Sequence, residues 1–359
     1  MKIAFYLGAL NRGGAETLLA DIFSRGDRLP FDAVCIYRNE GTMSDVFHRT
    51  SVPMLRLRRK RSWMLYGLRL RRLVLREKVD IVHAQTAFNA AIAILFLAFT
   101  RVKVVTTFHG FGFVNANPLY KRLVFRHSRR LIFVSNNERD EFLKHGSYGV
   151  EDRCVVVYNG IDFSKFGYAK PPTSDLSAVN VCMVGSFGEG RNHLFVCKCL
   201  NALKQKGVDF HFTFIGAARD SERAIYDNCV NYCHQHGLDG NVTFYGLSND
   251  VPHLLTEMDA FVYATRHDSF GIAVIEAIAT GLPTFVNDNV VMQELSNNGQ
   301  FATLYKTDDI DSFVSHFEDF LSQRQDYFER AQQSAAHVRT RYDIDRHINT
   351  LFEHYKSVI

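Results

Sequence analysis

The feature that most constrains the fold is a repeated alternation of short apolar runs with longer helical patterns. The short runs are rich in β-branched and aromatic residues, as is typical of strands that are buried on both faces. They cover residues 2–8, 31–37, 80–85, 103–110, 130–135 and 154–160, and then 179–187, 211–216, 241–246, 260–265 and 282–287. Strand then helix, repeated, predicts parallel sheets covered by helices. Two such series in 359 residues predict two doubly wound α/β domains.

The pattern breaks at residues 167–177, GYAKPPTSDLS, where Pro, Gly and Ser interrupt the periodicity. We therefore expect a first domain over 1–166, a linker over 167–177 and a second domain over 178–342. The tail 343–359 is a helical stretch too short to form a domain, and it could pack back on the first one. Ligands of open parallel sheets bind beyond the carboxyl ends of the strands, so two facing domains would form a cleft there.

Charge is divided unevenly between the two halves of the chain. Residues 1–170 carry 28 Lys+Arg against 14 Asp+Glu, a net charge of +14, whereas residues 171–359 carry 14 against 24, a net charge of −10. The basic half is expected to face an anionic surface or ligand.

Cysteine usage and hydropathy bear on localisation. Seven scattered cysteines suggest no disulfide framework and fit a reducing cytoplasm. Cysteines 197, 199, 229 and 233 do not match the paired spacing of zinc sites, so no metal site is expected. The longest apolar run, residues 90–99, is about half of what a membrane span needs, which predicts a soluble or peripheral protein.

The stretch RHDSFGIAVIEAIATGLP, residues 266–283, places one carboxylate, Glu276, within a strongly apolar helical run. A buried ionised carboxylate is costly unless something pairs with it, so the segment predicts a ligand or a partner. A strand before it would put Asp268 in the following loop and Glu276 about one turn into the helix. A carboxylate can accept two hydrogen bonds from a diol such as a ribose. A structural salt bridge to an arginine is the alternative.

Other loops after strands offer groups for an anion. Gly13 and Gly14 precede a helix expected to begin near residue 15, where backbone amides can approach a bound group, although neither the dinucleotide nor the P-loop pattern is present. His109 follows another strand. Arg191, which binds phosphate oxygens in a fork, follows the strand that ends at Gly185. Each of these also has an ordinary structural interpretation.

The order of the motifs resembles the retaining GT-B glycosyltransferases of the "glycosyl transferases group 1" type, which are family 4-like. The resemblance covers nearly the whole chain. It is carried by GGAE (13–16), VSNNERDEF (134–142), VVYNGID (156–162), VGSFGEGRNH (184–193), NVTFYG (241–246), the pair Asp268 and Glu276 in D-x7-E, and Glu294 in QEL. It implies a GT-B fold of two Rossmann-like domains, with the acceptor on the first and a nucleotide sugar on the second.

The resemblance also implies roles for single residues. Asp268 would contact the donor sugar, Glu276 the nucleotide ribose, and His109 would lie near the sugar. The two clamp cations of the family fall on Ser186 and Arg191. The resemblance also implies that Gly13 and Gly14 face the diphosphate and the acceptor. The amides of Phe270, Gly271 and Ile272 would lie at the N-terminus of the helix that carries Glu276, ready for a phosphate. Gly185 and Glu294 complete the expected donor-binding residues.

Two departures from the family pattern bear on the donor. Asp268 is one methylene shorter than the usual Glu, and Ser186 replaces the first clamp cation, which leaves more of the phosphate charge to Arg191. The chemistry that the resemblance implies is transfer with retention, in which the departing phosphate takes the acceptor proton. Neither a protein general base, a metal nor another cofactor is then expected.

Residues 55–76, LRLRRKRSWMLYGLRLRRLVLR, contain nine Lys+Arg among aliphatic and aromatic residues. We expect a basic helix that contacts an anionic membrane surface. A solvated charged helix is the alternative, and no motif for nucleic acid accompanies the segment. The expected membrane residues are Arg58, Arg59, Lys60, Arg61 and Trp63.

Together these features predict a cytoplasmic enzyme, peripheral on the inner face of the cell membrane. It would transfer a sugar from a nucleotide diphosphate sugar, with UDP as the first candidate, to a lipid-linked saccharide in surface polysaccharide (O-antigen or capsule) synthesis. Two alternatives are a nucleotide-sugar epimerase on the same scaffold and a non-catalytic, membrane-associated nucleotide-sugar-binding protein.

Overall fold

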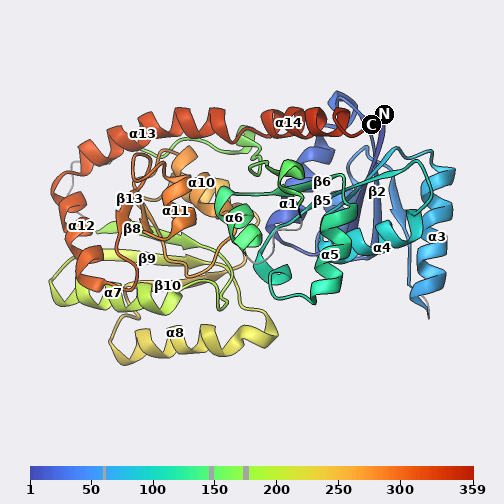
Figure 1. Cartoon of the computed structure of the whole chain (residues 1–359). Coiled ribbons are helices and arrows are strands. Elements are labelled where there is room, and N and C mark those ends of the chain that lie inside the picture. The colour runs from blue at the N-terminus through green and yellow to red at the C-terminus, as the bar shows by residue number, and fades with distance from the viewer. Residues whose placement is uncertain (60–61, 145–148, 173–177) are drawn as a thin grey trace. The chain divides into compact units, whose positions relative to one another are not determined.

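The computed structural model describes residues 1–59, 62–144, 149–172 and 178–359. It divides into two compact units, which are treated separately here (Figure 1). Unit 1 consists of residues 1–161 and 342–359, and unit 2 of residues 162–341.

Unit 1 is built on a parallel sheet of seven strands among the described residues, in the order β3-β2-β1-β4-β5-β6-β7. The strands are β1 (Lys2–Ala9), β2 (Asp32–Asn39), β3 (Met54–Arg56), β4 (Ile81–Ala84), β5 (Lys103–Thr107), β6 (Arg130–Phe133) and β7 (Cys154–Val156). The helices are α1 (Gly14–Ser24), α2 (Ser44–His48), α3 (Trp63–Arg76), α4 (Ala87–Leu97), α5 (Pro118–His127), α6 (Asn136–Lys144) and α14 (Ile344–Lys356).

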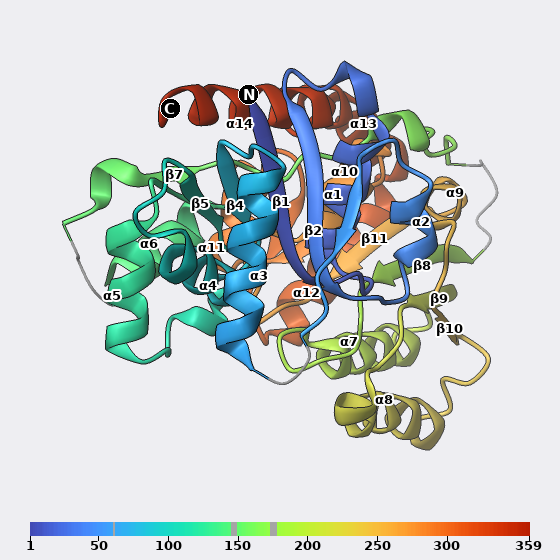
Figure 2. The same cartoon turned by 90° about the vertical axis from the view of Figure 1, so that its right-hand side faces the viewer.

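Side chains of β1 alternate between the two faces of this sheet, because successive residues of a strand point to opposite sides. Ile3, Phe5 and Leu7 pack in a core with α1, α2 and α14. Ala4 and Tyr6 pack on the other face, in a core with α3, α4 and α5 (Figure 2). The C-terminal helix α14 is therefore part of unit 1, where it contacts α1.

Unit 2 contains a parallel sheet of six strands among the described residues, in the order β10-β9-β8-β11-β12-β13. The strands are β8 (Val179–Val184), β9 (Phe210–Ile215), β10 (Val242–Gly246), β11 (Ala260–Tyr263), β12 (Thr284–Asn287) and β13 (Thr303–Tyr305). The helices are α7 (His193–Gln205), α8 (Arg223–Gln235), α9 (Val251–Thr256), α10 (Ile272–Ala279), α11 (Val290–Leu295), α12 (Ile310–Ser322) and α13 (Arg324–Arg341). The predicted GT-B class of two Rossmann-like domains is confirmed.

The boundary between the units differs from the expected linker at 167–177. It falls after Ile161, because Phe163 and Phe166 are buried within unit 2. The Arg339 guanidinium of α13 donates to the carbonyls of Phe163 and Phe166, which holds this segment on unit 2. Residues 173–177 of the expected linker lie outside the described residues.

The basic segment 55–76 is not a single helix. Its first residues belong to β3, which pairs with β2 in the register Ile36 with Leu55, and the helix begins only at Trp63. Ser62 caps that helix by accepting a hydrogen bond from the Met64 amide at 3.2 Å. The expected membrane residues Lys60 and Arg61 lie outside the described part of the chain.

Candidate functional site

The sheet of unit 2 reverses its strand order between β8 and β11, and this is where open α/β sheets bind ligands. The two strands are paired, with Val181 opposite Ala260, so the loops that follow them leave the same edge of the sheet. The loop after β8 carries Gly185, Ser186 and Arg191, and the loop after β11 carries Asp268. Sequence reasoning placed these groups in separate loops, and the structure brings them together.

Arg191, Tyr263 and Asp268 form one hydrogen-bonded group. The Arg191 Nε–H donates to the Tyr263 hydroxyl at 2.8 Å, and that hydroxyl donates to Asp268 Oδ2 at 2.7 Å. Arg191 Nη1 donates to Ser186 Oγ at 3.2 Å. Arg191 Nη2 lies 3.9 Å from Asp268 Oδ2. A cation and a carboxylate thus stand side by side at the carboxyl edge of the sheet, both partly exposed.

The backbone fixes the position of Arg191. The residue forms an antiparallel bridge with Thr265, and the Thr265 hydroxyl donates to the Gly190 carbonyl at 2.8 Å. Gly185 lets the Arg191 side chain pass close to the backbone at position 185. A Cβ there would lie 2.6 Å from Arg191 Nε. A larger residue would therefore clash with Arg191, which explains the glycine at position 185.

Tyr263 was missed by sequence reasoning, although its hydroxyl joins two predicted site residues. It ends β11 within an apolar run and was interpreted only as a strand residue. The phenol is fully buried, and burial raises its pKa well above the ordinary value. The hydroxyl therefore stays protonated and can keep donating to Asp268. The one signal that could have identified Tyr263 was its place at the end of a strand, where side chains of an α/β domain reach the ligand site.

Helix α10 begins directly after this group. Its N-cap, Gly271, has φ of 92°, a conformation that favours glycine, and a Cβ there would lie 2.9 Å from Met292 Cε of α11. The Phe270 amide, expected to bind phosphate, donates to Asp268 Oδ1 at 3.4 Å. Ile272 is the first residue of the helix and is half-buried.

Glu276 lies on α10 and Glu294 on α11, and both are half-buried. Glu276 lies about one turn into α10, as the sequence predicted. Its neighbours Ile275 and Ala277 are fully buried, but the side of the helix that carries Glu276 reaches the surface. The contact of Glu276 with a ribose stays a prediction.

In unit 1, the predicted Gly13 and Gly14 lie at the N-terminus of α1, as Gly13 is its N-cap. His109 follows β5, and its Nε2 lies 2.9 Å from Gln85 Oε1. Since an amide oxygen only accepts, Nε2 carries the proton. Burial lowers the pKa of His109 to about 4, so the ring is neutral at physiological pH.

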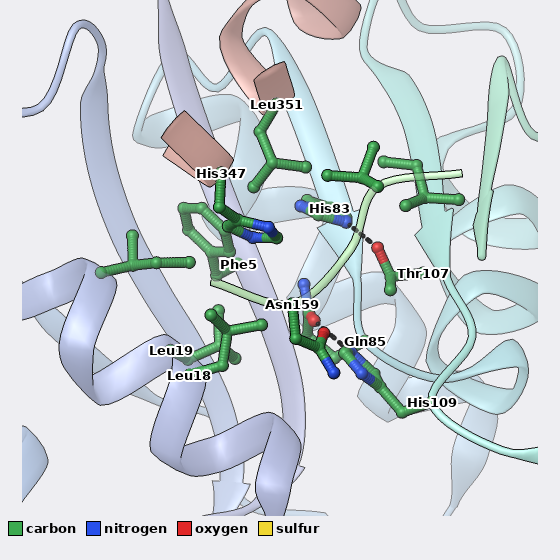
Figure 3. A pocket seen from close by; sticks show the side chains of 13 residues that line it. Phe5, Leu18, Leu19, His83, Gln85, Thr107, His109, Asn159, His347 and Leu351 are labelled. Atoms are coloured by element: carbon green, nitrogen blue, oxygen red, sulfur yellow. Dashed lines mark hydrogen bonds between the residues drawn. The ribbon is translucent and has the colours of Figure 1, made fainter. Parts of the chain in front are cut away.

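His109 lines a small cavity of unit 1, which is about 10 Å³ and has room for about one water molecule (Figure 3). His83 also lines it, with Nδ1 2.6 Å from the Tyr355 hydroxyl and Nε2 2.6 Å from Thr107 Oγ1. Gln85 Nε2 and Asn159 Oδ1 have no hydrogen-bond partner within the described residues, and both atoms are buried. At this volume the cavity is too small for a sugar.

No group of three or more His, Cys, Asp or Glu side chains within the described residues is arranged to hold a metal ion. Cys197, Cys229 and Cys233 are buried thiols without disulfides. No helix in the described part of the chain has the length and hydropathy to cross a membrane.

Comparison with known proteins agrees with the fold. Residues 12–165 match Glycosyltransferase Family 4, and residues 170–338 match Glycosyl transferases group 1. The chain belongs to the GT-B glycosyltransferases of this group. The resemblance inferred from the sequence motifs is thereby confirmed.

Among the relatives of this glycosyltransferase is the Escherichia coli UDP-Gal:alpha-D-GlcNAc-diphosphoundecaprenol alpha-1,3-galactosyltransferase. The two are 27% identical over 265 residues, 68% of this chain and 67% of the relative. The putative glycosyltransferase EpsF of Bacillus subtilis is 23% identical over 322 residues, 80% and 79% of the two chains. The crystal structure of Anabaena Alr3699/HepE in complex with UDP and glucose has a TM-score of 0.86 at 18% identity, covering 99% of this chain and 100% of that one.

Proposed function

We propose that this glycosyltransferase moves a sugar, with retention of configuration, from a UDP-sugar to a lipid-linked saccharide during surface polysaccharide synthesis. The observation that carries the proposal is the pairing of Arg191 with Asp268 around the Tyr263 hydroxyl, at the point where the second sheet reverses its strand order. A cation binds a diphosphate, and a carboxylate accepts hydrogen bonds from sugar hydroxyls. A nucleotide sugar carries a diphosphate and a sugar next to each other, so one ligand would engage both Arg191 and Asp268.

Each part of the donor has a matching group in unit 2. The Nη atoms of Arg191 would bind the diphosphate, and Asp268 would accept hydrogen bonds from sugar hydroxyls. Glu276, one turn into α10, would accept from the ribose diol. UDP is the first candidate because the names of two similar proteins contain it, one as UDP-Gal and one as a complex with UDP and glucose.

In the proposed transfer reaction, negative charge develops on the departing diphosphate. The bond between the anomeric carbon and the phosphate oxygen breaks, a bond from that carbon to the acceptor oxygen forms on the same face, and the acceptor proton passes to the departing phosphate. Arg191 would stabilise the negative charge that gathers on the diphosphate. We propose that this cation serves in place of a metal ion, so excess chelator should leave the transfer rate unchanged.

The acceptor side of the proposal rests on the surface of unit 1. Arg58 and Arg59 are exposed, and no described carboxylate lies within salt-bridge distance of either. The Arg59 guanidinium lies 4.9 Å from the centre of the Trp63 ring, which is 40% exposed. Further along α3, Met64 and Leu65 are 62% and 58% exposed. Cations beside exposed apolar side chains fit the inner, anionic face of the cell membrane, where a lipid-linked acceptor is held.

The donor proposal is tested by a thermal-shift screen of UDP- and GDP-sugars, followed by an assay of labelled sugar transfer to polyprenyl-diphosphate-linked saccharides. A bound donor stabilises the fold by mass action. We expect a UDP-sugar to raise the melting temperature and its sugar to appear on the lipid. Isomerisation of the donor alone would instead indicate an epimerase, and binding without any transfer would indicate a non-catalytic protein.

The membrane proposal is tested by vesicle flotation of the double variant Arg58→Glu and Arg59→Glu. Each cation near an anionic surface contributes roughly 1 kcal/mol, so the double reversal should weaken binding to phosphatidylglycerol vesicles by more than about tenfold. The matched control is Lys206→Glu with Arg223→Glu, which changes the net charge equally on unit 2. Equal partition of both double variants would refute this membrane site.

A further inference from the structure

Tyr263 places one hydroxyl between two ions of opposite charge. It accepts a hydrogen bond from Arg191 Nε at 2.8 Å and donates one to Asp268 Oδ2 at 2.7 Å. Across it, Arg191 Nη2 and Asp268 Oδ2 stay 3.9 Å apart, which is longer than a direct charge-assisted hydrogen bond of about 2.8 Å.

The surroundings hold this phenol in one position. The ring is fully buried at the end of β11, and its backbone carbonyl accepts a hydrogen bond from the Tyr305 hydroxyl at 2.7 Å. The Arg191 guanidinium also lies 5.7 Å from the centre of the Tyr263 ring. A rigid hydroxyl that both accepts and donates keeps each ion partly satisfied without letting the two ions close on each other.

Without that hydroxyl, the nearest group of opposite charge for each ion would be the other. A direct pair between Arg191 and Asp268 would satisfy both charges internally, and a ligand would then have to break it before binding. The side chains are 29% and 17% exposed, so the pair would be only partly screened by water.

We propose that Tyr263 is a positioning residue that keeps Arg191 and Asp268 apart, so that the cation is available to the donor diphosphate and the carboxylate to the donor sugar. The inference rests on the proposed function and deepens it.

The first test is structural and requires no ligand. In a crystal structure of the variant Tyr263→Phe, the closest Arg191–Asp268 nitrogen to oxygen distance should shorten from 3.9 Å to about 3 Å. The matched control is Thr284→Val, which removes a buried hydroxyl of β12 that, within the described residues, bonds only to the Leu282 carbonyl, and it should leave that distance unchanged. A distance that stays near its present value in Tyr263→Phe would overturn the inference.

The second test uses titration calorimetry with UDP and UDP-glucose. Tyr263→Phe should weaken UDP binding by about tenfold or more, because Arg191 is diverted to Asp268. Adding Asp268→Asn removes the competing charge, so the double variant should bind UDP about as well as Asp268→Asn alone. Such a rescue is not expected from general loss of packing, and its absence would overturn the inference.

The two tests separate this inference from the proposed function. If the unaltered protein binds no UDP or UDP-sugar while the Tyr263→Phe structure shows the closed ion pair, the spacing role stands and the donor assignment fails. If UDP binds well and is unaffected by Tyr263→Phe, the donor assignment stands and the spacing role fails.

Discussion

The stability that Glu138 of α6 contributes to the protein should fall between pH 6.5 and pH 8. Its side chain is fully buried, and its Oε2 accepts a hydrogen bond from the Val134 amide at 2.9 Å. Burial raises the pKa of this carboxyl from 4.5 to about 8. A folded-state pKa above the unfolded one contributes stability that is fully present below pH 4.5 and is lost as the pH rises through 8.

Four histidines titrate with the opposite sign. Burial lowers their pKa values to about 3 or 4, so the stability that they contribute rises with pH until the unfolded chain has also lost the proton, which is only half complete at the unfolded pKa of 6.5. These residues are His83, His109, His193 and His347. Between pH 6.5 and pH 8, linkage predicts a loss of roughly 1.5 kcal/mol from Glu138 and a gain of roughly 0.4 kcal/mol from each histidine, so the contributions nearly cancel in the parent, and that of Glu138 is measured against a variant without its carboxyl.

Thermal unfolding of the full chain and its variants measures the Glu138 contribution. For a unit of this size, roughly 1.5 kcal/mol corresponds to roughly 3–6 °C in melting temperature. Glu138→Gln removes the titrating group, so from pH 6.5 to pH 8 its melting temperature should rise by about that amount relative to the parent, whereas Glu141→Gln, on the same helix but partly exposed, should follow the parent. A Glu138→Gln variant whose melting temperature changes with pH as that of the parent does would refute the reasoning.

Three further predictions concern unit 2. Arg191→Ala should raise the dissociation constant for UDP by about 10- to 100-fold in calorimetry, because charge-assisted hydrogen bonds contribute about 1.5–3 kcal/mol; unchanged affinity would contradict its role. Glu276→Ala should abolish the thermal shift produced by a UDP-sugar, and an undiminished shift would show that the ribose contact is misassigned. Gly271→Ala should cost about 1–3 kcal/mol in denaturant unfolding, from its φ of 92° and the Met292 contact, and should cost more than Gly207→Ala, where φ is 79° with open space around it.

Much of the fold could be predicted from hydrophobic patterning, because strands of a doubly wound sheet are buried on both faces and form continuous apolar runs. The runs 2–8 and 179–187, for example, correspond to β1 and β8. The strands that were missed, β3 and β13, each have three residues. β3 borders a run of arginines whose charge suggested a basic helix at a membrane surface, and pairing with β2 overrides that local preference.

The candidate site could be predicted in part, because its polar residues follow strands. The approach of Arg191 to Asp268 depends on strand order, which local sequence does not encode. Tyr263 could not be distinguished from a core residue, since its ring is buried and only its hydroxyl reaches the site. The exposure of Glu276 depends on which side of α10 the rest of unit 2 covers, and an apolar run does not reveal that.

The most direct test of the account is a crystal structure of this protein with UDP bound. We expect the diphosphate within hydrogen-bond distance of the Arg191 Nη atoms and the ribose hydroxyls on the Glu276 carboxylate. Density for UDP away from the carboxyl edge of the second sheet, with Arg191 and Glu276 making no contact to it, would contradict the account.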